Sequence, residues 1–232
     1  MTRNNSTGSR GDRVDSAVAE FKESFYSGLI SDVLDSLGLM QQALSPDIRP
    51  IDDSLKLVGR ARTMLYAAVY APPRPDENPY VLEIQLVDDL KPGDVAVAAC
   101  GGSRRIAPWG GLLSTASTMR GAVGALMDGS VRDIRDIREL GFPVFAKGIA
   151  PLDSWGRGKV IEIDVPVEVG GVLIRAGDIV FGDVDGCIII PRDRVDEVLD
   201  RGREKLVAEN KTQQALQEGR LLADVYEEFG VL

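Results

Sequence analysis

The middle of the chain alternates short apolar strands with helices, and this alternation restricts the possible folds more than any other feature. Three apolar runs, Asp94–Cys100, Gly124–Met127 and Val144–Lys147, are typical of buried strands. Helical patterns separate them, over residues 109–120 and 130–140. Strands linked by helices run parallel, so their C-terminal ends meet at one edge of a sheet, where such folds bind ligands. We therefore expect an α/β domain with its binding site at that edge.

The segments on either side extend this core. Residues 14–37 favour two helices, residues 56–70 a strand and residues 81–90 an amphipathic helix. Residues 159–191 are rich in Val, Ile and Gly, which is typical of short antiparallel strands, and residues 192–229 are helical again. The sequence shows neither an internal repeat nor a linker. We therefore predict one domain over residues 14–232, preceded by a disordered polar tail over residues 1–13.

The sequence contains no histidine, and this absence excludes several kinds of active site. Ser-His and Cys-His nucleophiles, histidine-ligated zinc or haem, and imidazole proton transfer are impossible in this chain. Proton chemistry must use carboxylates, lysine, tyrosine, arginine-tuned groups or water. Cys100 and Cys187 lie far apart in apolar stretches, so we expect two buried thiols in a reducing cytoplasm rather than a zinc cluster.

The net charge and the hydropathy of the chain indicate which kinds of partner it can bind. Lys and Arg number 27 and Asp and Glu number 36, which gives a net charge of −9. A chain this acidic should repel nucleic acid, and no apolar run approaches the roughly 18 residues needed to span a bilayer. We expect a cytoplasmic protein that binds neither nucleic acid nor membrane.

The segment around Arg132 carries the strongest chemical signal. Asp128-Gly129 is expected to end a strand and Ser130 to cap the next helix, which places Arg132 and Asp133 in its first turn. Asp136 would then share a helix face with both. A guanidinium beside two carboxylates can bind a substrate carboxylate together with Mg²⁺ or Mn²⁺. The same residues could instead form a helix cap and an ordinary surface ion pair.

Further candidates lie near the same sheet edge. Gly110-Gly111 would let the backbone approach a ligand closely, although a simple turn uses the same pair. Arg104-Arg105 could meet a second substrate carboxylate, unless both are solvated loop residues. We prefer a structural role over a Schiff base for Lys147, and packing roles over substrate contact for Trp109 and Trp155.

The segment around Arg132 also resembles the RraA-like family, which includes class II aldolases acting on 4-hydroxy-4-methyl-2-oxoglutarate and regulators of ribonuclease E activity. The family pattern is an acidic residue or glycine, twenty residues, Arg-Asp, two residues and a final acid. Here the pattern reads Gly111, then Arg132-Asp133, then Asp136. Other matching stretches are Ser31–Gly38, Lys91–Asp94 and Asp183–Pro191.

The resemblance implies a single layered β/β/α domain with mixed sheets, similar to the swivelling phosphohistidine-like fold. It also implies trimers or hexamers of the chain with sites between subunits. Asp133 would hold Mg²⁺ or Mn²⁺, and Arg132 would bind the carboxylate and enolate oxygen of a pyruvyl group. The backbone N–H groups of Leu112 and Leu113 would bind the same carboxylate.

The chain departs from the family at Gly111, where the established aldolases commonly carry aspartate. A carboxylate that orients water at the metal is therefore missing, which bears on activity toward the best-known substrate of the family. Asp136 is the following acid of the pattern and would order Arg132 or a nearby water. Family enzymes also borrow an acid from a neighbouring subunit, for which Glu209 is a candidate, although a solvated helix charge would look the same.

The residues and the resemblance together predict a divalent-metal-dependent lyase acting on a small 2-oxo acid. The reaction would be retro-aldol cleavage of a 4-hydroxy-2-oxo acid such as 4-hydroxy-4-methyl-2-oxoglutarate, decarboxylation of oxaloacetate, or both, through a pyruvate enolate. A divalent ion suits this chemistry because it can draw electrons from the 2-oxo acid. The alternative is a non-catalytic regulator that binds a ribonuclease or helicase, for which an acidic surface is suited.

Overall fold

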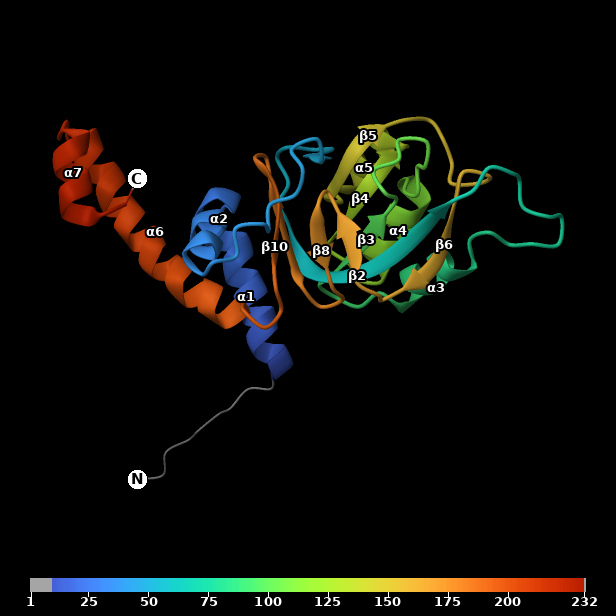
Figure 1. Ribbon diagram of the computed structural model, residues 1–232, viewed down its shortest axis with the longest axis horizontal. Coiled ribbons are helices and arrows are strands. Elements are labelled where there is room, and N and C mark those ends of the chain that lie inside the picture. Colours follow the sequence, from blue (N-terminus) through green and yellow to red (C-terminus); the bar gives the residue numbers. More distant parts are fainter. Residues whose placement is uncertain (1–9, 232) are drawn as a thin grey trace, which may run out of the picture.

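The computed structural model describes residues 10–231, which form a mixed β-sheet domain with a helical arm at one end (Figure 1). The central part of the sheet consists of four parallel strands, β2 to β5, in the spatial order β5-β4-β3-β2. One helix connects each consecutive pair, as the alternating pattern predicts for β3 to β5. The elements are β2 (Leu57–Ala68), α3 (Val81–Asp89), β3 (Asp94–Ala99), α4 (Gly111–Met119), β4 (Gly124–Val131), α5 (Ile134–Leu140) and β5 (Val144–Ile149).

Antiparallel strands extend this core on both sides. The two-residue strand β1 (Arg49–Pro50) pairs with β5, and the hairpin of β9 (Ile179–Asp183) and β10 (Gly186–Ile190) pairs with the first part of β2. The second part of β2 pairs with β6 (Gly158–Ile163). The chain around Ala43 lies along β10, where Leu44 N donates to the carbonyl of Cys187 and Ile189 N to that of Gln42. The expected α/β class and mixed sheet are confirmed, whereas the phosphohistidine-like type stays a prediction.

Three groups of buried apolar side chains hold the layers together. One lies between the sheet and helices α3, α4 and α5, and includes Met64, Leu86 and Trp109. The second lies on the opposite face under a separate hairpin, β7 (Val167–Val169) and β8 (Val172–Ile174), and includes Phe145. The third joins β9 and β10 to α1 (Arg10–Ser24), α2 (Ser27–Ser36) and α6 (Val195–Gln217), and includes Phe25.

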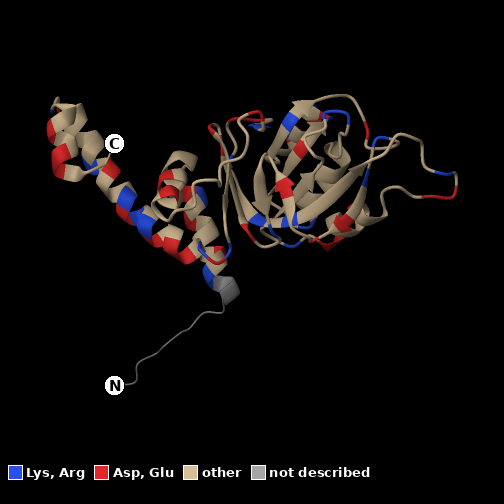
Figure 2. Ribbon diagram, viewed as in Figure 1, with Lys and Arg blue, Asp and Glu red and all other residues tan. Residues whose placement is uncertain are grey.

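The helical arm is formed by α6 and α7 (Leu222–Phe229), which extend away from the sheet (Figure 1). Acidic and basic residues mix along α6, whereas the strands carry few charges (Figure 2). Helix α6 packs closely on Phe25 at Gly202. A side chain at this position would clash with the Phe25 ring, so the close packing requires glycine. None of the helices within residues 10–231 is both long and apolar enough to cross a bilayer.

The predicted boundary between strand β4 and helix α5 is wrong. Strand β4 was expected to end at Met127 and the helix to begin at Ser130, but β4 continues to Val131 and α5 begins at Ile134. Neighbouring segments supply hydrogen bonds that keep the chain extended: Ser130 N donates to Ile106 O at 2.9 Å, and Ala150 N to Val131 O at 3.0 Å. Ser130 is therefore a strand residue rather than a helix cap, since tertiary partners outweigh the local turn signal.

Two other expectations concern the start of the chain and the cysteines. Residues 10–13 of the predicted tail belong to α1, and the rest of that tail lies outside the described residues. Cys100 and Cys187 are both buried free thiols, as predicted. Burial in apolar surroundings raises the pKa of each thiol, so both stay protonated.

We predict that Asp183→Ala lowers the free energy of unfolding by about 2 kcal/mol, because it leaves buried donors without an acceptor. The buried Asp183 carboxylate accepts hydrogen bonds from Ser27 N at 2.8 Å, from Ser27 Oγ at 2.7 Å and from Asp185 N at 3.0 Å. It thereby fixes the start of α2 to the end of β9. Urea denaturation should show this loss, while the exposed neighbour Asp185→Ala should stay near wild type. Equal stability of the two variants would contradict the role of Asp183.

Candidate active site

A cavity of about 320 Å³ opens at the C-terminal edge of the parallel strands, where the fold predicts a binding site. Its wall is built from α3, the chain before α4, the first turn of α4, the residues after β4 and the loop after β5. Five of the predicted site residues line it: Gly110, Leu112, Leu113, Arg132 and Asp133. The other lining residues are Tyr80, Glu83, Ile84, Ala107, Pro108, Trp109, Asp153 and Ser154.

The extension of β4 carries Arg132 and Asp133 to this edge. Arg132 N donates to Trp109 O at 3.1 Å, which holds the chain before α4 alongside the end of β4. Trp109 is 1% exposed, and its indole Nε1 donates to Ser114 Oγ at 2.9 Å. The indole also stacks on Phe142. Trp109 is therefore a packing residue that fixes the cavity wall, as predicted.

Asp133 connects the end of β4 to the start of α4. Its backbone is left-handed, with φ 59° and ψ 41°, a conformation that aspartate adopts more readily than most residues. Non-glycine residues in this region cost about 1–3 kcal/mol and concentrate at functional sites. Asp133 Oδ2 accepts a hydrogen bond from Gly111 N at 3.1 Å. A Cβ on Gly110 would stand 2.5 Å from the same oxygen, so glycine is needed there for this close approach.

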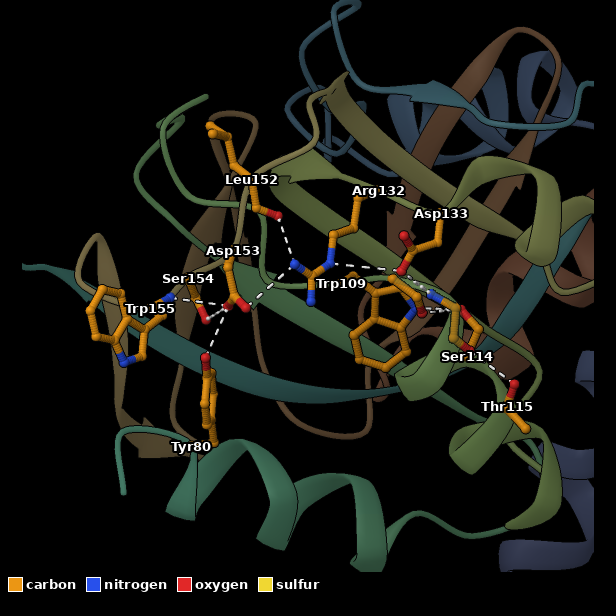
Figure 3. A network of polar contacts seen from close by, with 12 residues as sticks. Tyr80, Trp109, Ser114, Thr115, Arg132, Asp133, Leu152, Asp153, Ser154 and Trp155 are labelled. Carbon is orange, nitrogen blue, oxygen red and sulfur yellow. Dashed lines mark hydrogen bonds and ion pairs between the residues drawn. The ribbon is translucent and has the colours of Figure 1, made fainter. Parts of the chain in front are cut away.

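Arg132 lies between two carboxylates (Figure 3). Its Nε is 3.7 Å from Asp133 Oδ2, and its Nη1 is 3.4 Å from Asp153 Oδ2 and donates to Leu152 O at 3.3 Å. Within residues 10–231, Nη2 makes no hydrogen bond or ion pair. The guanidinium is thus held in place by two of its nitrogens while the third is free to bind a ligand carboxylate.

The first turn of α4 adds backbone donors to the same wall. The first intrahelical hydrogen bond runs from Ser114 N to Gly110 O, so helix geometry leaves Leu112 N and Leu113 N without partners inside α4. The positive end of the helix dipole lies there too. Leu112 is 86% exposed, so this turn lies at the protein surface. Both donors lie on the cavity wall that carries Arg132.

Asp136 does not stand where the sequence predicts. It lies in the first turn of α5, whereas Arg132 and Asp133 precede that helix, so the three residues do not share a helix face. The Asp136 Oδ2 atom lies 3.2 Å from the point that a Cβ on Gly111 would occupy. Asp136 is not part of the cavity lining, but its carboxylate stands beside the position of the aspartate that the family pattern places at residue 111.

The residues present fit a hydrated divalent ion better than a closed metal cage. Among the described residues, no three His, Cys, Asp or Glu side chains lie together as a metal group. Asp133 lines the cavity with a side chain that is 42% exposed, and its Oδ1 accepts no hydrogen bond within residues 10–231. Mg²⁺ commonly binds through one or two carboxylates and takes its other ligands from water and substrate. Asp133, with Asp136 nearby, matches that donor set.

Three ionisable residues of the cavity do not stand out in the sequence: Tyr80, Glu83 and Asp153. Asp153 accepts hydrogen bonds from Trp155 N at 3.1 Å and from Tyr80 Oη at 3.2 Å. Burial would raise the pKa of Asp153, but the Trp155 hydrogen bond and the Arg132 charge outweigh it and lower that pKa. Burial raises the pKa of Tyr80 to about 12, with the Asp153 charge contributing. Asp153 is therefore an anion that orients Arg132, and Tyr80 keeps its proton.

Glu83 is the most unusual of the three. It lies in the first turn of α3, is 6% exposed and lines the cavity. Burial raises its pKa to about 7, against the opposing effect of Tyr66. The available signal was its place in an amphipathic helix, but the pattern alone does not show which face of that helix meets the sheet.

The remaining candidates lie apart from the cavity lining. Lys147 Nζ pairs with Asp47 Oδ2 and Asp128 Oδ1, each at 3.5 Å, which supports its structural role. Arg104 and Arg105 are exposed, and Arg105 stacks on Tyr70. Trp155 is 47% exposed because its loop lies at the surface, so it packs less fully than predicted, and it is not among the residues that line the cavity. Glu209 lies on α6, where it pairs with Lys205 and accepts a hydrogen bond from Tyr26, and its role toward a neighbouring subunit stays a prediction.

Comparison with known proteins agrees with this architecture. The family model RraA-like, described as Aldolase/RraA, matches residues 28–189. A protein of Halalkalibacterium halodurans, provisionally named a 4-hydroxy-4-methyl-2-oxoglutarate aldolase, is 34% identical over 200 residues, which are 85% of this chain and 87% of that protein. Protein DlpA of Legionella pneumophila is 29% identical over 203 residues, which are 88% of this chain. The matched region covers only 32% of the length of DlpA.

A solved structure shows the same fold. Streptomyces coelicolor RraAS2, described as an unusual member of the RNase ES inhibitor RraA protein family, superposes with a TM-score of 0.75 at 29% identity. The match covers 85% of this chain and 96% of RraAS2. The family pattern from Gly111 to Asp136 falls inside the matched region, and its Arg132 and Asp133 line the cavity. The chain therefore belongs to the RraA-like family.

Proposed function

We propose that this chain is a divalent-metal-dependent carbon–carbon lyase that acts on a small 2-oxo acid. The reaction is retro-aldol cleavage of a 4-hydroxy-2-oxo acid such as 4-hydroxy-4-methyl-2-oxoglutarate, decarboxylation of oxaloacetate, or both. One observation carries the proposal: Arg132, Asp133 and the N–H groups at the start of α4 meet on one cavity wall. The provisional aldolase name of the Halalkalibacterium halodurans relative supports the same reaction class.

The residues divide the work of binding a 2-oxo acid. The free Nη2 of Arg132 and the N–H groups of Leu112 and Leu113 bind the substrate carboxylate. Arg132 also stabilises the negative charge that grows on the C2 oxygen as the bond breaks, which is where preorganised donors contribute most to rate. Asp133, with Asp136 beside it, would hold Mg²⁺ or Mn²⁺, and such an ion supplies Lewis-acid stabilisation of that charge.

Asp136 offers a physical answer to the departure at Gly111. A glycine at position 111 leaves room that the Asp136 carboxylate occupies, since Oδ2 lies 3.2 Å from the missing Cβ. In our proposal, Asp136, the final acid of the family pattern, also takes over the role of the absent carboxylate by ordering water next to Asp133. A carboxylate in the first turn of α5 thus serves a site at which the first turn of α4 carries none.

A regulatory function is the second candidate, because the matched structure RraAS2 is described as belonging to an RNase inhibitor family. The net charge of −9 would favour a basic partner such as a ribonuclease or helicase. A regulator of this kind binds through its surface rather than its cavity. Retained capture of such a partner by Arg132→Ala protein, together with no lyase activity in wild type, would favour regulation over catalysis.

We expect wild-type protein with Mg²⁺ or Mn²⁺ to release pyruvate from oxaloacetate, from 4-hydroxy-4-methyl-2-oxoglutarate, or from both. EDTA should remove the activity, and Asp133→Asn should weaken metal binding about 10-fold or more because a neutral amide is a poorer ligand. Coupled lactate dehydrogenase measures the pyruvate, and calorimetry measures metal binding. Wild-type protein that releases no EDTA-sensitive pyruvate from a broad panel of 2-oxo acids would contradict the proposal.

We expect Arg132→Ala to lower kcat/KM by about 100- to 1,000-fold, because it removes a donor aimed at developing charge. Arg135→Ala is the matched control, since Arg135 is an exposed neighbour in α5. Steady-state kinetics on the same substrate should leave the control within about twofold of wild type. Similar losses in both variants would mean that general surface charge, rather than the guanidinium of Arg132, supports turnover.

We expect Asp136→Ala to lower kcat/KM by about 10- to 100-fold, the usual cost of removing a group that supports a metal site. Glu139→Ala provides the comparison, because Glu139 is an exposed acid on the same helix. Thermal unfolding of both variants would establish that the fold is intact. Full activity of Asp136→Ala would show that this carboxylate does not replace the one absent at residue 111.

A further inference from the structure

We propose that Glu83 carries the proton between the hydroxyl group of the substrate and the enolate carbon, a role that rests on the proposed lyase function. The reaction needs such a group because an enolate becomes pyruvate only when a proton reaches its C3 atom. The chain has no histidine to do this work. Nothing in the family pattern around Gly111 and Arg132 assigns the task to α3.

The position of Glu83 suits this role. Its side chain enters the cavity from α3, and Arg132 and Leu113 line the same cavity from β4 and α4. Only 6% of Glu83 is exposed, so its carboxyl group meets the cavity rather than bulk solvent. The Tyr66 hydroxyl group stands close to the Glu83 carboxyl group and lowers its pKa, but Glu83 makes no hydrogen bond of normal geometry within residues 10–231, so a ligand in the cavity can become its partner.

A second buried polar atom lies in the same region. The Tyr66 hydroxyl group on β2 is buried and has no hydrogen-bond partner among the described residues. Burial raises the pKa of Tyr66 well above its usual value, and the Glu83 charge adds to this rise, so the two groups lie close together. Unpartnered buried polar atoms are costly, and they are tolerated where a ligand or water completes them. Glu83 and Tyr66 thus lie next to each other, Glu83 on the cavity wall and the Tyr66 hydroxyl group behind it, and neither makes a hydrogen bond of normal geometry within the described residues.

The groups around Glu83 leave it able to change charge near neutral pH. Burial raises its pKa to about 7; Tyr66 and Arg132 act against this rise, and Asp153 adds to it. Cys100, after β3, faces the same region and stays a protonated thiol because burial raises its pKa. Tyr80 keeps its proton and Asp153 keeps its charge. Glu83 therefore exists in both forms at neutral pH, as a group that takes and returns a proton must.

Glu83 alone can carry out both proton transfers of the cleavage reaction. The Glu83 carboxylate takes the proton from the C4 hydroxyl group, and the electron pair of that O–H bond forms the new C4=O double bond. The C3–C4 bond breaks, and its electron pair becomes the C2=C3 bond as the C2 carbonyl pair moves to oxygen. The Glu83 acid then gives the same proton to C3, the C2=O bond re-forms and Glu83 returns to the carboxylate.

The reverse half of this chemistry gives a direct test. Wild-type protein with Mg²⁺ in D₂O should exchange the methyl protons of pyruvate for deuterium, which proton NMR measures. Glu83→Gln should slow the exchange at least about 100-fold, since an amide cannot take the proton. Asp88→Asn is the matched control, because it removes an exposed acid from the same helix and should exchange within about twofold of wild type.

Two further readouts separate proton transfer from binding or folding. Oxalate, which resembles the enolate, should bind Glu83→Gln within about threefold of wild type in calorimetry. Infrared difference spectra of the metal-free proteins should show one carboxyl group that titrates at pH about 7 in wild type and is absent in Glu83→Gln. The kcat/KM for cleavage should fall below this pH in wild type, because the carboxylate form is needed, and should lose that dependence in the variant.

The outcomes distinguish this role from the proposed function. Wild-type exchange that Glu83→Gln matches would overturn the role of Glu83 and leave the lyase proposal standing. Wild-type protein that neither exchanges pyruvate nor cleaves any 2-oxo acid would overturn both. Slow exchange in Glu83→Gln together with lost oxalate binding would assign Glu83 to binding and overturn its role in proton transfer.

Discussion

The hydrogen bond from Gly111 N to Asp133 Oδ2 is the contact on which the candidate site depends. It joins the end of β4 to the start of α4, two places that are more than twenty residues apart in the chain. Because of it, the carboxylate of Asp133, the guanidinium of Arg132 and the free N–H groups of α4 face one cavity. The close approach requires the absence of a side chain at Gly110 and the left-handed backbone of Asp133. The restrained backbone at Gly110 and Asp133 thus holds the positive charge of Arg132 and the negative charge of Asp133 at one site.

Much of the fold could be predicted because buried strands and amphipathic helices leave strong periodic signals. The parallel direction of β3, β4 and β5 follows from those signals and from the need for helical connections. The end of β4 could not be predicted, because Ile106 and Gly148 pair with it from distant parts of the chain. Local residue preferences favour a turn at Asp128-Gly129, and only the folded neighbours show that the strand continues.

The candidate site likewise contains residues that a short sequence pattern identifies and residues that only the folded structure brings together. The spacing from Gly111 to Asp136 identifies Arg132 and Asp133, since their chemistry is carried by a short pattern. Glu83 carries no such pattern, because an acid in an amphipathic helix usually faces water. Its burial depends on how α3 lies against β2, and its raised pKa follows from that burial. Asp153 could not be predicted either, because the role of this loop residue depends on its ion pair with Arg132, which only the folded structure shows.

The ends of the sheet have a consequence for how the protein behaves when crowded with copies of itself. Exposed strand edges are templates on which other chains add strands and form aggregates. Here one end of the sheet is the two-residue strand β1, and the other, β10, is partly covered by the chain around Ala43. Neither end therefore offers a long row of unpaired backbone groups. The arrangement thereby limits strand addition at these two ends, while β6, which pairs with β2, forms a further edge of the sheet.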